Sequence, residues 1–219
     1  ARELQRRQAE VTLLVAGRHA AEQLALAAKN GLPACEVPAF RLPEDLLSGL
    51  AFPARTMGAV AAARRRLRAL CPDLLLGMGS FAAVPACFAA RLEGVRLVLH
   101  EGNAWMGRAN RFSSRWARVA GLSLPLVEGC RVHCPTVRTG MPLRDALVTA
   151  AQQPAYPEAF AAAAGLSRSR RTVLVFGGSQ GARFINDTLA QTARLLGAAA
   201  ERLQVIHLTG TEENAGLIQ

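Results

Sequence analysis

The sequence predicts an α/β protein with doubly wound, parallel β-sheets, and two observations support this fold class. First, short apolar runs alternate along the chain with longer stretches of helical pattern, as in repeated βαβ units. Second, the apolar runs are continuous, as expected for parallel strands that helices cover on both faces. Strands are expected at residues 11–16, 73–77, 96–100, 132–139, 172–176 and 204–208, and helices at 19–30, 57–70, 81–92, 105–118, 156–164, 181–197 and from 212 onward.

The composition excludes several classes of protein. Hydrophobic residues make up 51% of the 219 residues and charged residues 19%, which is too apolar for a disordered tail. No apolar run approaches the roughly 18 residues that a membrane-spanning helix needs. The five cysteines are an odd number, which favours reduced thiols in a cytosolic protein over a secreted disulfide framework.

The charge of the chain indicates an anionic partner. The formal net charge is +10, and Lys29 is the only lysine, so arginine carries almost all of the positive charge. Arginine presents a planar fork of donors that suits phosphate. Nucleic acid, an acidic membrane surface and a phosphorylated substrate all fit this balance. The alternative is that the arginines only occupy solvated faces.

Residues 140–157 interrupt the strand–helix alternation, because they contain Pro142, Pro154 and Pro157 and few β-branched residues. The interruption predicts a first α/β domain at 1–140, a linker at 141–164 and the start of a second domain at 165–219. The first residues read as the tail of a helix and the last as the beginning of another. We therefore expect a fragment of a longer protein, with the first domain nearly complete and the second truncated.

Two glycine-rich turns each follow an apolar strand and lead into a helix. Glycines bring backbone N–H groups close to an anion, and a helix N-terminus adds further donors. Both turns would lie at carboxyl ends of strands, where open α/β sheets bind ligands. The alternative is two tight turns without a ligand. The candidate phosphate-binding residues are Gly77, Gly79 and Ser80 in the first turn and Gly177, Gly178 and Gly181 in the second, where Ser179 is either a helix cap or a ligand donor.

The segment HEGN at 100–103 ends the strand expected at 96–100. It does not complete the zinc motif HExxH, because residue 104 is alanine. Asn103 lies where a polar side chain can reach a ligand, whereas His100 fits either a ligand contact or a satisfied core histidine. The segment CRVHC at 130–134 offers three metal ligands where structural zinc needs four. No metal site is therefore expected.

Residues 44–70 are the best candidate for a membrane-binding surface. Apolar side chains rimmed by arginines suit anionic lipid, because the apolar groups enter the interface and the guanidinium groups meet headgroups. A core-packed helix with a solvated basic side explains the same pattern. The residues expected at the membrane are Leu47, Leu50, Phe52, Arg64, Arg65 and Arg68.

Four segments together resemble one family over almost the whole chain. LGMGSF, LVLHEGNAWMGRANR, TGMPLR and VLVFGGSQGAR occur in the order and spacing of the MurG family, the bacterial N-acetylglucosaminyltransferases that convert lipid I to lipid II. The resemblance implies a GT-B fold, with two Rossmann-like domains and UDP-GlcNAc held mainly by the second. It also implies an inverting, peripheral enzyme on the cytoplasmic face of the plasma membrane, without a cofactor or an essential metal.

The resemblance also implies site residues. Asn103 matches the asparagine of the HExN motif, Arg144 the arginine of a GNPxR segment and Ser179 the serine of GGSxG, all contacts of UDP-GlcNAc in the family. The two glycine turns would bind phosphates of the acceptor or the donor. The histidine usually proposed as general base would precede Ala1, so no catalytic residue is assigned, and we expect this chain alone to be inactive.

Two other classes of function compete with this interpretation. An arginine-rich nucleic-acid-binding module would need stacking aromatic residues, and the chain has two tryptophans and one tyrosine, so no nucleic acid is expected. An NAD-dependent nucleotide-sugar epimerase would need an acidic residue for the ribose after the strand at 204–208. That position reads HLTG, which disfavours the epimerase.

Overall fold

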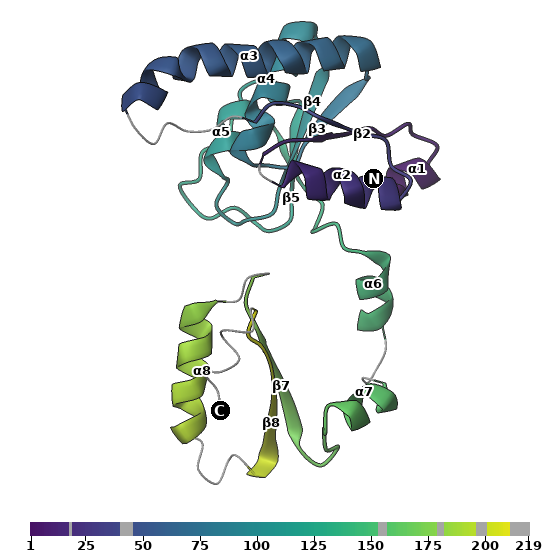
Figure 1. The fold of residues 1–219 in the computed structure, drawn as a ribbon, viewed down its shortest axis with the longest axis vertical. Helices are drawn as coiled ribbons and strands as arrows, with labels where there is room; N and C mark the ends of the chain where they lie inside the picture. Colours follow the sequence, from purple (N-terminus) through teal and green to yellow (C-terminus); the bar gives the residue numbers. More distant parts are fainter. Residues whose placement is uncertain (18, 40–45, 153–156, 179–181, 196–200, 211–219) are drawn as a thin grey trace. The chain divides into compact units, whose positions relative to one another are not determined.

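The computed structural model describes residues 1–17, 19–39, 46–152, 157–178, 182–195 and 201–210, with side chains of the long helix described from residue 55 onward. The chain divides into two compact units, Ala1–Pro142 and Leu143–Gln219, and each is described by itself (Figure 1). All strand pairs in both units are parallel. The α/β class with parallel sheets, predicted from the continuous apolar runs, is therefore confirmed.

The first unit contains a two-stranded and a four-stranded parallel sheet. The four strands follow the order β3-β4-β5-β6, so each strand pairs with the next one along the chain. Helices connect most of these strands, as parallel pairing requires. The strands are β1 (Leu13–Val15), β2 (Ala34–Glu36), β3 (Leu74–Gly77), β4 (Arg96–Glu101), β5 (Val119–Leu122) and β6 (Thr136–Arg138). The helices are α1 (Arg2–Arg6), α2 (Ala20–Lys29), α3 (Leu46–Leu70), the 3₁₀ turn η1 (Phe81–Ala83), α4 (Val84–Glu93) and α5 (Arg108–Ser113).

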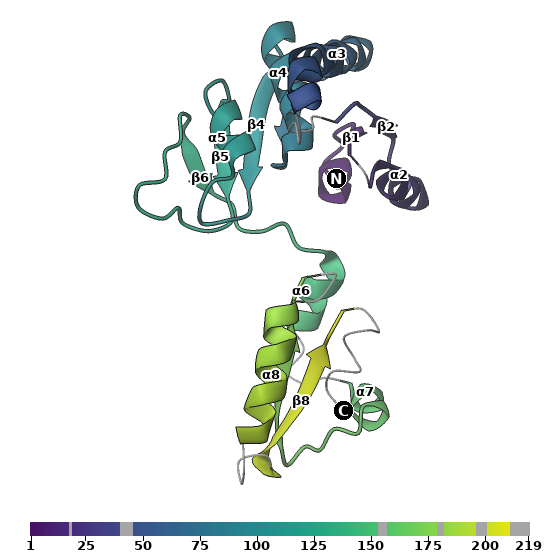
Figure 2. The same ribbon diagram turned by 60° about the vertical axis from the view of Figure 1, so that its left-hand side comes forward.

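The core of the first unit is centred on β4. Leu97 and Leu99 are each only 1% exposed, and they pack with Cys87, Met106 and Ala120. Helices α3 and α4 lie side by side above the sheet, as Figures 1 and 2 both show, and buried apolar side chains form the contact between them. That contact is formed by Val60, Ala63 and Leu67 on α3 and by Ala86, Ala89 and Ala90 on α4.

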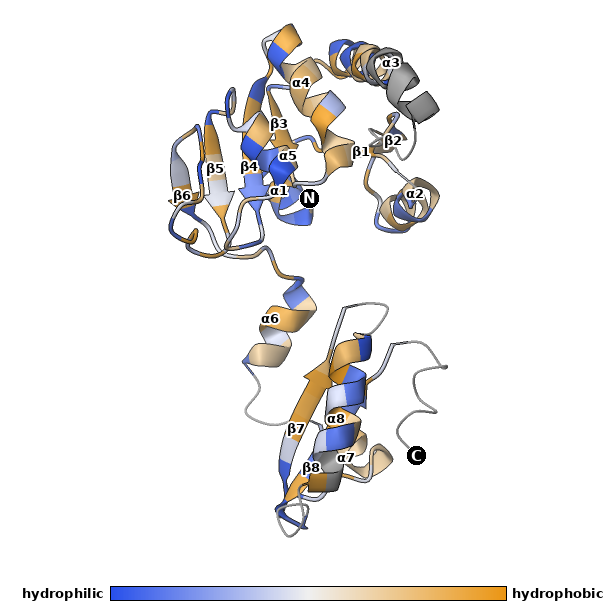
Figure 3. Ribbon diagram, turned by 90° about the vertical axis from the view of Figure 1, so that its left-hand side faces the viewer, coloured by the Kyte–Doolittle hydropathy of each residue, from blue (hydrophilic) through white to orange (hydrophobic). Residues whose placement is uncertain are grey.

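The second unit has one parallel pair of strands. Its elements are α6 (Asp145–Ala151), α7 (Glu158–Ala163), β7 (Arg171–Phe176), α8 (Arg183–Leu195) and β8 (Leu203–Leu208). The register runs from Arg171 opposite Leu203 to Phe176 opposite Leu208. The carboxyl-terminal part of β7 is apolar (Figure 3), yet Leu174 and Phe176 on this strand and Leu208 on β8 are exposed. Among the described residues, the two-sided cover that such strands predict is therefore incomplete.

Several expected elements differ from those observed. Strands β2 and β5 and helix α6 were not predicted from the sequence, and α3 begins well before residue 57, running past Pro53. A proline disfavours a helix interior, so the sequence pattern is clear only beyond it. The helix expected at 105–118 is the shorter α5, because Gly107 has an extended conformation and serves as its N-cap. The strand expected at 132–139 is reduced to β6, and the helix expected from 212 lies outside the described residues.

Candidate functional site

A buried carboxylate organises the loop that follows β4. Glu101 is the last residue of the strand and is 4% exposed. Its Oε1 accepts hydrogen bonds from the backbone N–H and from Nδ2 of Asn103, both at 3.0 Å. Its Oε2 accepts from the backbone N–H of Gly107 at 2.9 Å and from Nδ2 of Asn110 at 3.0 Å. One side chain therefore fixes both the loop and the start of α5.

These four hydrogen bonds determine the charge of Glu101. Burial by itself raises the pKa of a carboxyl group, and it is the largest single influence on this one. The bonds donated by Gly107, Asn110 and Asn103 together outweigh burial and hold the pKa of Glu101 below its usual value. Glu101 is thus a fixed anion that accepts hydrogen bonds, which suits a positioning role better than proton transfer.

Asn110 joins this loop to the first glycine turn. The side chain is buried, and its Nδ2 donates to the carbonyl oxygen of His100 at 2.9 Å and to Oε2 of Glu101. A Cβ placed on Gly79 would lie 3.2 Å from the same Nδ2, so the turn packs directly on the amide. Gly79 also has a φ of +78°, which favours glycine. The expected phosphate turn and the expected ligand loop are therefore neighbours.

The first glycine turn lines a hollow in the unit. A Cβ on Gly77 would lie 2.9 Å from Cδ2 of Leu99 and 3.1 Å from Sγ of Cys87, so packing behind the turn excludes any side chain there. Ser80 has a φ of 102°, and its Oγ accepts a hydrogen bond from the backbone N–H of Ala82 at 3.2 Å. Gly77, Gly79 and Ser80 all line a cavity of about 280 Å³. All three residues predicted for this turn therefore face one space.

The two polar side chains of the HEGN segment have different environments. Asn103 is exposed, and its side-chain amide nitrogen donates to Glu101, so its side-chain carbonyl oxygen is the part of the amide that does not take part in this bond. His100 is half-buried, with its Nε2 lying 3.2 Å from Oγ of Ser123 and 3.3 Å from the carbonyl oxygen of Gly140. Of the two interpretations of His100, the satisfied core histidine is the one that the structure shows.

The second glycine turn is described only in part. Gly177 and Gly178 follow β7, and a Cβ on Gly178 would meet no atom within 4 Å. Ser179 and Gly181, which the sequence also predicts as ligand residues, lie outside the described residues. Arg144 is exposed and is the N-cap residue of α6. Arg144 belongs to the second unit and Asn103 to the first, so each of these two predicted contacts is described within its own unit.

Sequence reasoning did not identify a polar cluster in the second unit. Asn186 is buried on α8, and its Nδ2 donates to the carbonyl oxygen of Thr209 at 3.1 Å. Its Oδ1 therefore faces Nε2 of His207, which lies 2.9 Å away and must carry the proton. The buried Nδ1 of His207 has no hydrogen-bond partner among the described residues. Because Asn186 and His207 are 21 residues apart, no local motif indicates the pair.

Two of the three arginines expected at the membrane form ion pairs within the first unit. Nε of Arg64 contacts Oε1 of Glu93 at 2.5 Å, and Nε of Arg68 contacts Oε2 of the same carboxylate at 2.7 Å. The hydrogen bonds from Arg68 and then Arg64 lower the pKa of Glu93. Arg65 lines a separate hollow beside β2. The side chains of Leu47, Leu50 and Phe52 lie outside the described part of the chain.

Within the described ranges, no helix is both long enough and apolar enough to cross a bilayer. The same part of the chain contains no group of three histidine, cysteine or acidic side chains arranged to hold a metal ion.

The parallel α/β units, with glycine turns at carboxyl ends of strands, define a protein of the GT-B class. The crystal structure of Acinetobacter baumannii MurG is similar over 100% of this chain and 58% of that chain, with 25% identity and a TM-score of 0.67. The UDP-GlcNAc 2-epimerase of Neisseria meningitidis, bound to UDP-GlcNAc, shares the fold at 12% identity, with a TM-score of 0.55 over 95% of this chain and 60% of that chain.

The chain belongs to glycosyltransferase family 28. Residues 1–121 match the N-terminal domain of that family, and residues 172–217 match its C-terminal domain. The resemblance to MurG proteins inferred from the motifs is thereby confirmed, as is the GT-B fold.

Curated relatives carry one common name, UDP-N-acetylglucosamine–N-acetylmuramyl-(pentapeptide) pyrophosphoryl-undecaprenol N-acetylglucosamine transferase. The relative from Frankia casuarinae is 38% identical over 175 residues, which are 80% of this chain and 44% of that protein. The relative from Acidothermus cellulolyticus is 34% identical over 214 residues, which are 97% of this chain and 56% of that protein. The chain thus spans about half the length of the curated relatives that it matches.

Proposed function

We propose that this chain is part of an inverting transferase that moves N-acetylglucosamine from UDP-GlcNAc to lipid I, a polyprenyl diphosphate carrying N-acetylmuramyl-pentapeptide, and so forms lipid II for peptidoglycan. The relatives of 34–38% identity bear the name of this activity. The reaction takes place on the cytoplasmic face of the plasma membrane, where the basic and apolar surface of residues 44–70 associates with anionic lipid. The net charge of +10 attracts both anionic substrates.

One observation carries the proposal for the first unit. Asn110 hydrogen-bonds β4 and Glu101 while packing against Gly79, so the glycine turn and the Asn103 loop are held as one rigid rim. The turn at Gly77–Ser80 offers its backbone to the diphosphate of the acceptor. The carbonyl oxygen of Asn103 accepts a hydrogen bond from a sugar hydroxyl or amide.

The second unit holds the donor in this proposal. Gly177, Gly178 and Gly181 bring backbone N–H groups to the diphosphate of UDP, and the start of the helix α8 adds its dipole. Ser179 donates its hydroxyl, and Arg144 supplies a guanidinium group. In the transfer step, a deprotonated acceptor hydroxyl attacks the anomeric carbon, and the bond to UDP breaks with inversion. UDP leaves with the electron pair, so donors around its phosphates stabilise the transition state.

The test is a chimera in which this chain replaces the matching region of the Acidothermus cellulolyticus relative. We expect the chimera to transfer radiolabelled N-acetylglucosamine from UDP-GlcNAc to a lipid I analogue, whereas residues 1–219 alone give no turnover. In the chimera, Arg144→Ala and Asn103→Ala should each lower kcat/KM by about tenfold or more, as loss of a charged or polar substrate contact does. Arg138→Ala, at an exposed residue outside the proposed site, is the matched control. A folded chimera without transfer activity would contradict the proposal.

A further inference from the structure

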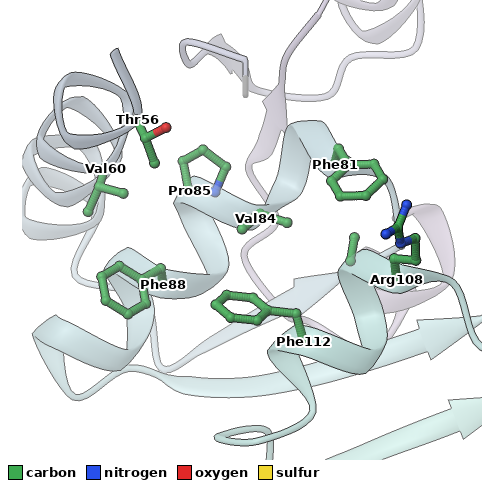
Figure 4. A pocket seen from close by; sticks show the side chains of 9 residues that line it. Thr56, Val60, Phe81, Val84, Pro85, Phe88, Arg108 and Phe112 are labelled. Atoms are coloured by element: carbon green, nitrogen blue, oxygen red, sulfur yellow. The ribbon is translucent and has the colours of Figure 1, made fainter. Parts of the chain in front are cut away.

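A second hollow of the first unit is almost wholly apolar and is separate from the glycine-turn cavity. It has a volume of about 370 Å³, which is within the range of small-molecule sites. Helices α3, α4 and α5 and the turn η1 contribute its walls (Figure 4). Its principal side chains are Val60, Phe81, Val84, Phe88, Arg108 and Phe112.

The walls of this pocket are held in place from behind. The ring of Trp116 packs edge-on against Phe112 at 5.0 Å and against Phe88 at 5.8 Å between centroids. Its Nε1 donates to the carbonyl oxygen of Cys87 at 3.1 Å, which fixes the indole to α4. Edge-to-face aromatic contacts of this kind are geometrically specific. The pocket is therefore preformed and can take an apolar group without first rearranging its walls.

One end of the pocket is positively charged and adjoins the phosphate turn. Phe81 lines the pocket and directly follows Ser80, which lines the glycine-turn cavity. The guanidinium of Arg108 lies at the same end as Phe81 (Figure 4). A ligand that enters here would have its apolar part among phenylalanine rings and an anionic group beside Arg108 and the glycine turn.

The opposite wall is part of the helix expected at the membrane. Thr56 and Val60 of α3 line the pocket, and residues 47–52 precede them on the same helix. At about 1.5 Å of rise per residue, the expected membrane residues lie only a few turns beyond the pocket wall. An apolar chain leaving the pocket along α3 would therefore run toward the lipid interface.

We propose that this pocket binds the isoprene units next to the diphosphate of the lipid-linked acceptor. The proposal rests on the proposed function for the identity of the acceptor, since the printed name of the relatives specifies a pyrophosphoryl-undecaprenol substrate. The pocket matches that chemistry at both ends: aromatic and aliphatic walls for a prenyl chain, and Arg108 with the glycine turn for the diphosphate. It recognises the carrier lipid itself, independently of the sugar and peptide that the lipid bears.

Binding of farnesyl diphosphate and of inorganic pyrophosphate to the 219-residue chain tests this proposal. Trp116 touches two wall residues, so its emission reports occupancy, and Trp105→Phe removes the other tryptophan. We expect farnesyl diphosphate to bind at least about tenfold more tightly than pyrophosphate, because burying apolar area adds affinity. Val84→Phe should fill the pocket and abolish this difference, whereas Val148→Phe, at an exposed position on α6, should preserve it. Arg108→Gln should weaken the binding of farnesyl diphosphate.

Three results would overturn the proposal. The first is equal affinity for farnesyl diphosphate and pyrophosphate. The second is that the Val84→Phe variant unfolds like the wild type but still binds farnesyl diphosphate more tightly than pyrophosphate. The third is that dioctanoyl phosphatidic acid binds as tightly as farnesyl diphosphate and loses affinity to the same extent in Val84→Phe. The last result would assign the pocket to membrane phospholipid. None of them bears on sugar transfer, which the chimera tests separately. Conversely, a chimera that fails to transfer sugar does not change the measured difference in affinity between farnesyl diphosphate and pyrophosphate.

Discussion

Both units contain continuously apolar strands, but the apolar side chains are buried in the central strand of the first unit and exposed in the second unit. In the first unit, β4 lies between two neighbouring strands, and its leucines are almost fully buried. In the second unit, β7 and β8 pair only with each other among the described residues, and Leu174 is 55% exposed and Phe176 62% exposed. Even in the first unit, Leu74 and Leu76 of the outer strand β3 are exposed. Continuous apolar sequence thus predicts a strand, but it does not predict how far that strand is buried, because the elements that cover the faces of the sheet determine burial.

The same contrast extends to the two glycine turns. The first turn is packed from behind by Leu99 and Cys87 and from the side by Asn110. In the second turn, no atom of the described residues lies near the position of a Cβ on Gly178. Backbone geometry at the first turn is therefore set by the core of the unit, whereas Gly178 is open to substitution. Mutations in the two turns should have different costs, and they provide ways to test this difference.

The largest effect is expected from Glu101→Ala. The substitution leaves the donors of Asn103, Gly107 and Asn110 without their acceptor in a buried place, so unit 1 should lose about 3 kcal/mol or more of unfolding free energy. Both tryptophans, Trp105 and Trp116, lie in unit 1, so urea unfolding followed by their fluorescence measures this loss.

Glu128→Ala, at an exposed glutamate, is the control for the change at Glu101 and should shift the urea midpoint very little. A loss below about 1 kcal/mol for Glu101→Ala would show that water replaces the carboxylate. The loop would then be held by its backbone alone.

The role of Glu101 also marks what the sequence could and could not predict. Strands β3 and β4 were predicted within a residue or so, because their leucine and valine runs are unambiguous. Strands β2 and β5 were missed because Ala-Cys-Glu and Val-Ala-Gly-Leu are short and rich in small residues. The glycine turns and Asn103 were identified by residue type at strand ends. The carboxylate of Glu101, which holds Asn103, was not identified, since spacing alone does not distinguish a buried acceptor from a ligand.

Contacts between distant residues were beyond sequence reasoning altogether. The pairing of Arg64 and Arg68 with Glu93 joins helices α3 and α4 across 29 and 25 residues, and no local pattern indicates it. Asn110 lies within the segment LVLHEGNAWMGRANR that carried the family resemblance, so its importance could be suspected. Its contact with Gly79 becomes visible only when the turn after β3 is placed beside the loop after β4.

A smaller loss of stability is expected from Gly77→Ala. The added methyl group would overlap Leu99 and crowd Cys87, and overpacking of this kind costs about 1–3 kcal/mol. Gly58→Ala is a matched control, because Gly58 lies within α3 with no atom near its Cβ position. It should stabilise the protein by about 0.5–1 kcal/mol. Changes of opposite sign in the unfolding free energies of Gly77→Ala and Gly58→Ala, measured with urea, would confirm that packing restricts Gly77. Equal changes would contradict the packing argument.

Acid should weaken unit 1 through two carboxylates. The pKa of Glu101 and that of Glu93 are both lowered in the folded protein from an ordinary value of 4.5. Their stabilising contribution is therefore complete above that ordinary value and is lost as the pH falls through the lowered folded pKa. We expect the tryptophan-detected urea midpoint to fall below about pH 4.5 and Glu101→Gln to flatten this dependence. If the urea midpoint of Glu101→Gln falls at low pH as it does in the unmodified chain, other groups cause the loss of stability in acid.

The smallest effect on stability is expected from Gly178→Ala. Among the described residues, the Cβ position of Gly178 has open space around it, and its φ is not left-handed. The free energy of unfolding, measured by urea denaturation with far-ultraviolet circular dichroism, should therefore change by less than about 0.5 kcal/mol. In the active chimera, however, the extra methyl group should hinder the approach of the diphosphate to the backbone and raise the KM for UDP-GlcNAc several-fold. Gly77→Ala would lose stability first, whereas Gly178→Ala would lose only ligand affinity. An unchanged KM for UDP-GlcNAc in a stable Gly178→Ala chimera would show that Gly178 does not contact the diphosphate. The open space around this glycine would then have no role in binding the donor.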